Sequence, residues 1–460
     1  MHKNLGKANG PDDNITPTYA SRLFDHPLPK YELPKSSVAP ETVYQLIKDE
    51  LQLDGNAHMN LATFVTTWME PSATKLMSET FEKNLIDRDE YPQTAEIEKR
   101  CVNILAKLWN APVDSAFGTS TVGSSEACML AGMALKWRWQ ARQEASGRPV
   151  DKPNLVLGGN AQICWEKFCR YWAIEPRFVP LDKGRYHIDA DLAIAMCDEN
   201  TIGVVGILGS TLDGSYEPIQ QLSEALDELQ SAKGFDIPIH VDAASGGFVA
   251  PFVQPDLLWD FRLLRVKSIN TSGHKYGMVY PGVGWIIWRH PDDLPKDLIF
   301  NVNYLGGNEP TFALNFSKPG NGVIAQYYNF LRLGWEGYYR IIKQCQDTAL
   351  YVSGKVAAMG PFELISNGSE LPVFTFKIKD NIDSFSLYDV SDAMKERGWQ
   401  VPAYTLPANL EQTIVMRIVV KENFSNDMAH LFVNDLRRQV NKLSNPRSSS
   451  PNEGNSSFHH

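Results

Sequence analysis

Two stretches of this 460-residue chain are the most informative: residues 240–247, His-Val-Asp-Ala-Ala-Ser-Gly-Gly, and residues 271–277, Thr-Ser-Gly-His-Lys-Tyr-Gly. In the first, a predicted buried strand ends at Asp242, and the small residues after it allow a flat molecule to approach. In the second, a strand runs into a loop that holds Lys275 between glycines. Ligands of an open α/β sheet bind at the carboxyl ends of its strands. The two stretches therefore predict an α/β sheet with a binding site at that edge.

The pattern around these stretches is also that of a mostly parallel sheet. From residue 155 onward, short apolar runs alternate with longer amphipathic ones, as strands alternate with crossover helices. The expected strands are residues 155–157, 202–208, 237–241, 266–270 and 284–288. The expected helices are residues 127–135, which are nearly all apolar, 162–172 and 218–232. The centre of the chain is therefore predicted to be an α/β domain.

The pattern changes after Gly334, where we expect a smaller α+β domain. Its expected elements are a long helix over 335–359, strands over 362–366, 373–378 and 415–420, and helices over 387–397 and 426–443. A proline-rich arm with one helix, over residues 40–53, precedes the α/β domain. The predicted organisation is an N-terminal arm (1–57), a large domain (58–346), a small C-terminal domain (347–443) and a flexible tail (444–460).

Composition and charge exclude several classes of protein. Lys and Arg total 44 against 54 Asp and Glu, which gives a net charge of −10 without a basic run that would follow a phosphate backbone. No apolar run approaches the ~20 residues that span a bilayer, and no secretory signal is recognisable. The six cysteines form no CxxC pair and are typical of reduced thiols. We expect a cytoplasmic protein without a nucleic-acid or membrane partner.

Lys275 and Asp242 together meet the requirements of one cofactor, pyridoxal 5'-phosphate (PLP). Alone, each has an ordinary explanation, since an aspartate after a strand often caps a turn and most lysines are solvated. PLP needs a lysine amine to condense with its aldehyde and a carboxylate to keep its pyridine nitrogen protonated. Upstream, residues 118–126, Gly-Thr-Ser-Thr-Val-Gly-Ser-Ser-Glu, lead into the expected buried helix, whose free N–H groups would bind a phosphate. The sequence therefore predicts a PLP site.

Further motifs follow in order along nearly the whole chain. They are Leu-Asp-Gly-Asn at 53–56, Asn-Leu-Ala-Thr-Phe at 60–64, Glu-Tyr-Pro at 90–92, Ser-Ser-Glu-Ala at 124–127, Gln-Ile-Cys-Trp at 162–165, Tyr-Leu-Gly-Gly at 304–307 and Phe-Ser at 316–317. With residues 240–247 and 273–275, this set resembles the PLP-dependent group II decarboxylases. The resemblance implies PLP fold type I, in which the large α/β domain has a mostly parallel seven-stranded sheet and the small C-terminal domain is α+β.

The resemblance also implies roles for individual residues. Lys275 would form the Schiff base with the cofactor, and Asp242 would pair with its pyridine nitrogen. The other cofactor-binding residues would be Ser124, Ser125 and His274 at the phosphate, Ser317 from a neighbouring subunit, Gln162 and Ala244 around the ring, and Thr211 beside it. The substrate-binding residues would be Thr63, Phe64 (through its backbone), Asn84 and Asp87 near a distal carboxylate, and Arg417 at the α-carboxylate.

The reaction that the resemblance implies is decarboxylation of L-glutamate to 4-aminobutyrate and CO2, through an external aldimine and a quinonoid intermediate. A site built from two subunits implies a homodimer or a higher homo-oligomer. Two alternatives stay open: a decarboxylase of aspartate, cysteine sulfinate or an aromatic amino acid, and a non-catalytic PLP-binding scaffold. On composition alone, Asp87 would belong to a solvated loop and Arg417 to an ion pair within the small domain.

The end of the chain differs from that of two groups within the family. Plant members carry a calmodulin-binding extension with a tryptophan and lysines, whereas Arg447 is the only Lys or Arg after Leu443 here, without a tryptophan, so no calmodulin partner is expected. Bacterial acid-resistance members end in a phenylalanine followed closely by histidine, and Phe458-His459-His460 is similar but one residue shorter. Above an unperturbed pKa of about 6.5 a histidine side chain is neutral, and in this form His459 or His460 would enter and close the site. No His, Cys and Asp cluster has metal-ligand spacing, so no metal is predicted.

Overall fold

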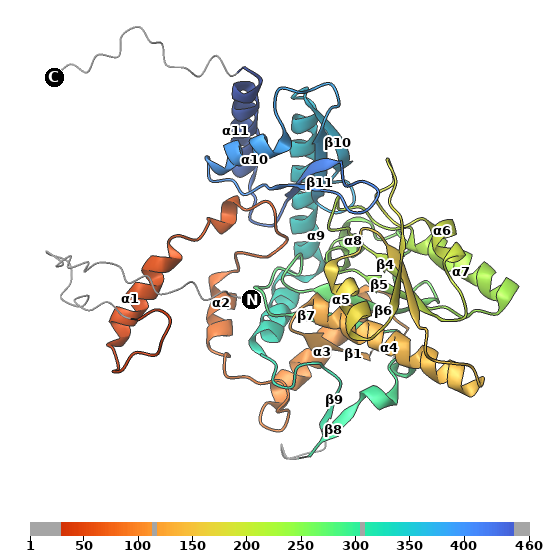
Figure 1. Ribbon diagram of the computed structural model, residues 1–460. Coiled ribbons are helices and arrows are strands. Elements are labelled where there is room, and N and C mark those ends of the chain that lie inside the picture. The colour runs from red at the N-terminus through yellow and green to blue at the C-terminus, as the bar shows by residue number, and fades with distance from the viewer. Residues whose placement is uncertain (1–28, 113–116, 304–308, 446–460) are drawn as a thin grey trace, which may run out of the picture. The chain divides into compact units, whose positions relative to one another are not determined.

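The computed structural model describes residues 29–112, 117–303 and 309–445 (Figure 1). The chain divides into two compact units, Met1–Asn56 and Ala57–His460. In the first unit, helix α1 spans Pro40–Leu51, and its proline stands in the first turn, where the missing N–H removes no helical hydrogen bond. The helix predicted over residues 40–53 therefore ends two residues earlier than expected.

A seven-stranded sheet forms the centre of the second unit (Figure 1). Its order is β1-β7-β6-β5-β4-β2-β3, with β1 (Phe117–Thr121), β2 (Asn154–Gly158), β3 (Glu175–Val179), β4 (Thr201–Ile207), β5 (Ile239–Asp242), β6 (Val266–Ser272) and β7 (Gly284–Trp288). Strand β7 is antiparallel to β1 and β6, and the other four pairs are parallel. Every residue of β2, β4, β5 and β7 is buried, as expected for strands covered on both faces. The predicted fold class is confirmed.

Helices connect and cover these strands. They are α2 (Pro71–Ser78), α3 (Pro92–Leu108), α4 (Ser124–Ala145), α5 (Ile163–Tyr171), α6 (Ala190–Ala195), α7 (Ile219–Lys233) and α8 (Ala250–Val253), with 3-10 turns at Ala57–Met59, Gly246–Phe248, Pro291–Asp293 and Lys296–Leu298. Helix α4 contains the predicted apolar run and packs against β4, β6 and β7. Within the described ranges, none of the helices combines the length and the apolar content that a membrane crossing requires.

The C-terminal part of this unit has its own sheet and apolar core. Helix α9 spans Asn321–Ala357 and bends at Gly334, whose φ of 58° favours glycine, so the helix predicted from residue 335 is its second half. The strands β10 (Phe362–Asn367), β11 (Val373–Ile378), β13 (Ile414–Val419) and β12 (Ala403–Thr405) form an antiparallel sheet in that order, beside α10 (Leu387–Lys395) and α11 (Asn426–Ser444). A separate two-stranded ribbon pairs β8 (Phe300–Val302) with β9 (Glu309–Thr311). The predicted small α+β domain is confirmed.

A buried ion pair joins helix α3 to the loop that carries Ser317. Lys318 Nζ lies 3.1 Å from Glu98 Oε1, and both side chains are 8% exposed. Glu98 also accepts hydrogen bonds from the Ser120 N–H at 2.9 Å and from Ser120 Oγ at 2.5 Å. Burial raises the pKa of Glu98, but Lys318 and Ser120 outweigh burial and bring that pKa below its ordinary value. The pair therefore holds the Ser317 loop against β1, the strand that leads into α4.

We expect Glu98→Gln to lower the free energy of unfolding by about 3 kcal/mol at pH 7, because the substitution leaves a buried ammonium without its counterion. Since its folded pKa is lowered, the carboxylate stabilises the fold above its unfolded pKa, and this stabilisation is lost as pH falls through the folded pKa. Urea unfolding measures the difference. The control is Glu96→Gln on the same helix, because the pair of Glu96 with Arg100 is exposed and worth less than about 1 kcal/mol. Equal losses in the two variants would contradict the prediction.

Candidate active site

The candidate site lies at the carboxyl ends of β5 and β6. Asp242 is the last residue of β5, and Lys275 follows the end of β6 by three residues. The loop between β6 and Lys275 packs closely at Gly273, where a Cβ would lie 2.6 Å from Val283 Cγ1 and 2.7 Å from Gln326 Oε1. Glycine at this position therefore allows the close packing that positions the lysine.

A cavity with a volume of about 540 Å³ opens at this edge. Most of the residues predicted for the site line it: Thr63, Phe64, Ser124, Ser125, Gln162, Thr211, Asp242, Ala244, His274, Lys275 and Arg417. Its wall thus combines segments of both predicted domains. Arg417 lies on β13 in the predicted small domain, and the other residues lie in the predicted large domain.

The Lys275 side chain is held inside this cavity. Its Nζ donates a hydrogen bond to Ser245 Oγ at 3.1 Å and lies 5.1 Å from the centre of the Phe64 ring. Burial lowers the pKa of Lys275, and the nearby Asp242 only partly offsets this effect. A lowered pKa increases the uncharged fraction of the amine, which is the form that attacks a carbonyl carbon.

Donors from two elements hold the Asp242 carboxylate at the cavity wall. Trp165 Nε1 of α5 donates to Oδ2 at 2.9 Å, and Asn270 Nδ2 of β6 donates to Oδ1 at 3.1 Å. Behind Asn270, His240 Nε2 lies 2.8 Å from Asn270 Oδ1. Burial lowers the pKa of His240 to about 4, so this imidazole is neutral near pH 7 and acts as a positioning group for Asn270.

The N-terminus of α4 forms a second polar wall. Gly123 precedes the helix and offers no side chain, so the N–H groups of Ser124 and Ser125 lack a side-chain cap. Burial lowers the pKa of His274 to about 4, and the charge of the neighbouring Lys275 contributes a smaller part of this shift. Among the described residues, the buried His274 Nδ1 has no hydrogen-bond partner. Uncapped amides and an unpartnered imidazole nitrogen at one helix end fit an anionic group such as a phosphate.

Comparison with known proteins identifies the family. The conserved domain of the pyridoxal-dependent decarboxylases matches residues 29–379. The chain belongs to the pyridoxal-dependent decarboxylase family. A glutamate decarboxylase of Aliivibrio fischeri is 53% identical over 432 residues, which cover 93% of each chain. One of Petunia hybrida is 50% identical over 94% of this chain and 87% of its own length.

Two solved structures have the same fold. The glutamate decarboxylase of Lactobacillus brevis matches with a TM-score of 0.89 at 48% identity, over 91% of this chain and 96% of its own. A sphingosine-1-phosphate lyase of Burkholderia pseudomallei matches with a TM-score of 0.77 at 22% identity, over 91% of this chain and 94% of its own. At this identity the similarity concerns the fold alone. The predicted family is confirmed, and its cofactor is PLP.

The cavity wall of this family member fits PLP. Lys275 can hold the aldehyde carbon, Asp242 can face the pyridine nitrogen, and His274 with the α4 N-terminus can bind the phosphate. Gln162 and Ala244, expected on either side of the ring, also line the cavity. Gln162 has a structural task as well, because its Oε1 accepts a hydrogen bond from the first turn of α5 at 2.6 Å and caps that helix.

Arg417 reaches the cavity from the middle of β13. Its guanidinium donates hydrogen bonds to the carbonyl oxygens of Thr211 and Ala62, and its Cζ lies 5.0 Å from the centre of the Phe64 ring. Its Nε is buried without a hydrogen-bond partner, and none of the described carboxylates pairs with it. The alternative that composition suggested, an ion pair within the small domain, is therefore wrong for the described part of the chain.

Three predicted residues do not line this cavity in their own chain. Asn84 Nδ2 donates a hydrogen bond to Ser317 Oγ at 3.3 Å, so these two side chains lie together. Asp87 Oδ1 accepts a backbone N–H of its own turn at 3.1 Å. Asn84 and Asp87 are half-buried, and Ser317 is exposed. The proposed regulatory histidines, His459 and His460, lie outside the described residues.

Several groups that shape the site were not predicted from the sequence. They are Ser245 at the lysine, Trp165 and Asn270 at the carboxylate, and Ser272, whose Oγ donates to Ser124 Oγ at 2.7 Å. Ser245 and Ser272 belong to the two stretches quoted first, and Trp165 follows Gln162 by about one helical turn. Proximity in the sequence to a predicted site residue could therefore have identified these three residues. Asn270 has no local sequence feature that would mark it as a site residue.

Proposed function

We propose that this PLP-dependent enzyme decarboxylates L-glutamate to 4-aminobutyrate and CO2. The observation that carries the proposal is the guanidinium of Arg417, which has no carboxylate partner among the described residues and lies on the same cavity wall as Lys275 and Asp242. An arginine in such a setting requires an anion. Glutamate as the amino acid is supported by relatives named glutamate decarboxylases, which are 53% and 50% identical over nearly the whole chain.

In this proposal, each group on the wall has one task. PLP, when bound, supplies an electron sink for the electron pair of the bond that breaks between Cα and the carboxylate. The negative charge of Asp242 stabilises a protonated pyridine nitrogen, and Arg417 binds the substrate α-carboxylate. Lys275 holds the cofactor between turnovers and gives way to the amine of the substrate. A proton replaces CO2 on Cα, so each turnover consumes one proton.

A second copy of the chain completes the site in our proposal. The Asn84–Ser317 hydrogen bond holds these two side chains together, and the N–H of Asp87 donates to the Asn84 carbonyl at 3.1 Å. If Ser317 binds the phosphate in a neighbouring subunit, Asn84 and Asp87 arrive with it and can face the distal carboxylate of the substrate. A homodimer is then the smallest active form, and a higher homo-oligomer can repeat this contact.

The remaining expectations stay predictions. The proposed domain limits are 1–57, 58–346, 347–443 and 444–460, and the boundary between residues 346 and 347 falls inside α9. Closure of the site by His459 or His460 is also a prediction, because both histidines lie outside the described residues. All six cysteines are free and buried, which supports a reducing, cytoplasmic location.

The proposal is tested by CO2 release from a panel of amino acids: L-glutamate, L-glutamine, L-aspartate, cysteine sulfinate and L-tryptophan. We expect glutamate to exceed glutamine by roughly 10- to 100-fold in kcat/KM, because the amide forfeits a charge-assisted bond worth about 1.5–3 kcal/mol. Protein without added amino acid is the control. Faster release from aspartate, cysteine sulfinate or tryptophan would establish another decarboxylase, and no release from any of them would favour a scaffold.

A further inference from the structure

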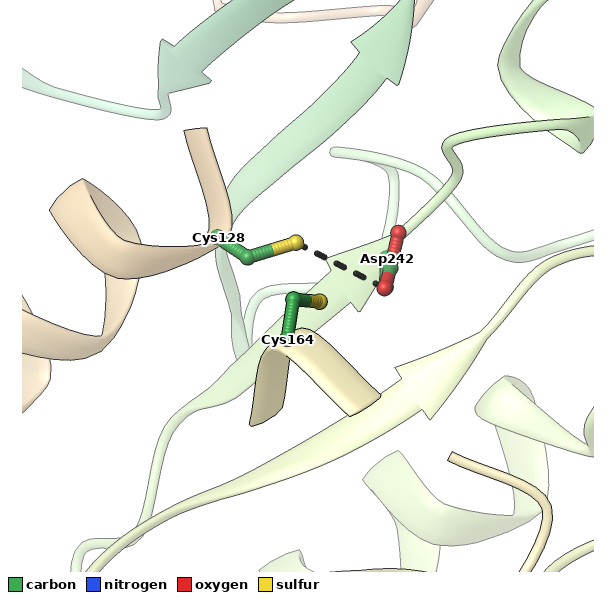
Figure 2. Close-up of side chains that lie close together, drawn as sticks. All are labelled: Cys128, Cys164 and Asp242. Atoms are coloured by element: carbon green, nitrogen blue, oxygen red, sulfur yellow. Dashed lines mark hydrogen bonds between the residues drawn. The ribbon is translucent and has the colours of Figure 1, made fainter. Parts of the chain in front are cut away.

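Two thiols that the decarboxylation does not use lie beside Asp242. Cys128 projects from α4 and Cys164 from α5, and both point toward the carboxylate at the end of β5 (Figure 2). The Cys128 and Cys164 sulfur atoms and one Asp242 oxygen all lie within 4.8 Å of one another. All three residues are buried. The chain segments that carry them are separated by 36 and 78 residues, so spacing in the sequence did not reveal this cluster.

We propose that Cys128, Cys164 and Asp242 form a binding site for a thiophilic divalent cation such as Zn²⁺, and that the cation and PLP exclude each other. The first half of the proposal depends only on the three side chains. The second half rests on the proposed pairing of Asp242 with the pyridine nitrogen. The prediction that the chain has no metal site is thereby replaced for the cofactor-free protein.

The distance between Cys128 and Asp242 fits such a cation, and Cys164 Sγ lies within 4.8 Å of both. In tetrahedral zinc sites the Zn–S distance is about 2.3 Å and the Zn–O distance about 2.1 Å, which places a sulfur and an oxygen ligand about 3.6 Å apart. The distance from Cys128 Sγ to Asp242 Oδ2 is 3.6 Å. In the cation-free protein this contact is a thiol hydrogen bond. A cation would replace the thiol proton without a large movement of either side chain.

The surroundings supply an entry path, support and charge balance. Cys164 and Asp242 line the cavity, so a cation can enter from it and keep an open position there for water. Trp165 Nε1 and Asn270 Nδ2 already orient the carboxylate, as outer-shell donors do in metal sites. Two thiolates and one carboxylate leave a net charge of −1 around a divalent cation, which the nearby Lys275 can offset when protonated.

Exclusion follows from the shared carboxylate. A protonated pyridine nitrogen needs the negative charge of Asp242, and a cation bound to the same carboxylate both uses that charge and repels the protonated ring. The open coordination position lies on the cavity side, where the ring would stand. The cation therefore binds the cofactor-free protein and opposes its loading with PLP.

The first experiment titrates the full-length protein, freed of PLP, with Co²⁺ and follows thiolate-to-cobalt charge-transfer absorption, with Zn²⁺ as the competitor. We expect one cation per chain. Cys128→Ser and Cys164→Ser should each weaken binding by roughly 100-fold, because even outer-shell partners contribute about 10- to 100-fold. The matched control is Cys169→Ser, a buried cysteine on the same helix as Cys164, which should leave the affinity within about twofold. Absence of the absorption band, or equal affinity in all three variants, would overturn the site.

A measurement without substitutions guards against variants that fail to fold. X-ray absorption of the Zn²⁺-loaded wild-type protein should give two sulfur ligands near 2.3 Å, with the remaining ligands oxygen. A shell without sulfur would overturn the proposal, whatever the variants do.

The second experiment tests exclusion by following PLP uptake through its absorbance, without any assay of turnover. We expect saturating Zn²⁺ to lower the apparent affinity for PLP at least tenfold, and the PLP-loaded protein to take up less than a tenth of the Co²⁺. Equal Co²⁺ binding with and without PLP would overturn the exclusion and leave the cation site standing. These readouts are separate from CO2 release, so failure of the proposed substrate and failure of the cation site are distinguishable.

Discussion

Lys275→Ala is expected to reduce CO2 release from glutamate by about 10⁴-fold or more. Among the residues that line the cavity, Lys275 is the only lysine, and its burial-lowered pKa equips it to react with a carbonyl carbon. No other amine on the wall can hold the cofactor or release the product from it. Enzymes accelerate such reactions by at least about 10⁶-fold, so the loss of the reacting amine removes a large share of the effect. Radiometric CO2 release in the presence of excess PLP measures it.

The control for this variant is Lys267→Ala, which removes a half-buried lysine from β6, the strand that leads to Lys275. It should keep wild-type CO2 release. Circular dichroism should show both variants folded, and PLP should leave the Lys275→Ala protein on dialysis because it is no longer held covalently. Near wild-type release from the folded Lys275→Ala protein would refute the role of this lysine.

Asp242→Asn is expected to lower kcat by at least about 100-fold. The substitution removes the negative charge that, in the proposed site, stabilises a protonated pyridine nitrogen, and preorganised electrostatic groups of this kind are worth about 10²–10³ in rate. It also leaves one oxygen where two now accept hydrogen bonds from Trp165 Nε1 and Asn270 Nδ2, so one buried donor faces the new amide group. Single-turnover kinetics and the PLP absorption spectrum measure the two consequences.

A matched control for Asp242→Asn is Asp260→Asn. Asp260 is also a buried aspartate, but it pairs with Arg262 and accepts a hydrogen bond from Asn110 Nδ2 at 2.8 Å, away from the lining of the cavity. We expect this variant to lose stability and to keep its kcat. If the two variants lost kcat equally, Asp242 would be a structural residue.

Buried regular elements were the part of the fold that the sequence predicted best. Strand β7 was predicted within its observed bounds, Gly284–Trp288, and α5 and α7 within one residue at each end, because continuous apolar runs and amphipathic periods report local burial. Strand β3, Glu175–Val179, was missed. It lies at the edge of the sheet. Its sequence, Glu-Pro-Arg-Phe-Val, has an exposed Glu175 and a half-buried Arg177, so it lacks an apolar pattern.

The sequence predicted a change of structure at Gly334 but only the second half of α9. Gly334 marked a change of pattern, and the structure has a positive φ there. The first half of α9, from Asn321, was not predicted. Gly334 interrupts the helical backbone; Val323 before it packs in the core of the large domain, whereas Ala349 and Val352 pack in the core of the small domain. Which core a helix face meets is a property of the packed molecule.

The sequence by itself determined the family and the cofactor, and it predicted as site residues those with a local signature, such as Lys275 in its glycine-flanked loop and Asp242 at the end of a buried strand. It did so because the chemistry of PLP restricts residue types within a few positions of a strand end. Only the tertiary structure decided the partners of these residues: Ser245 at the lysine, Trp165 at the carboxylate, and the two thiols beside it. Contacts between segments up to 114 residues apart depend on how helices pack on the sheet, and local patterns do not encode that packing.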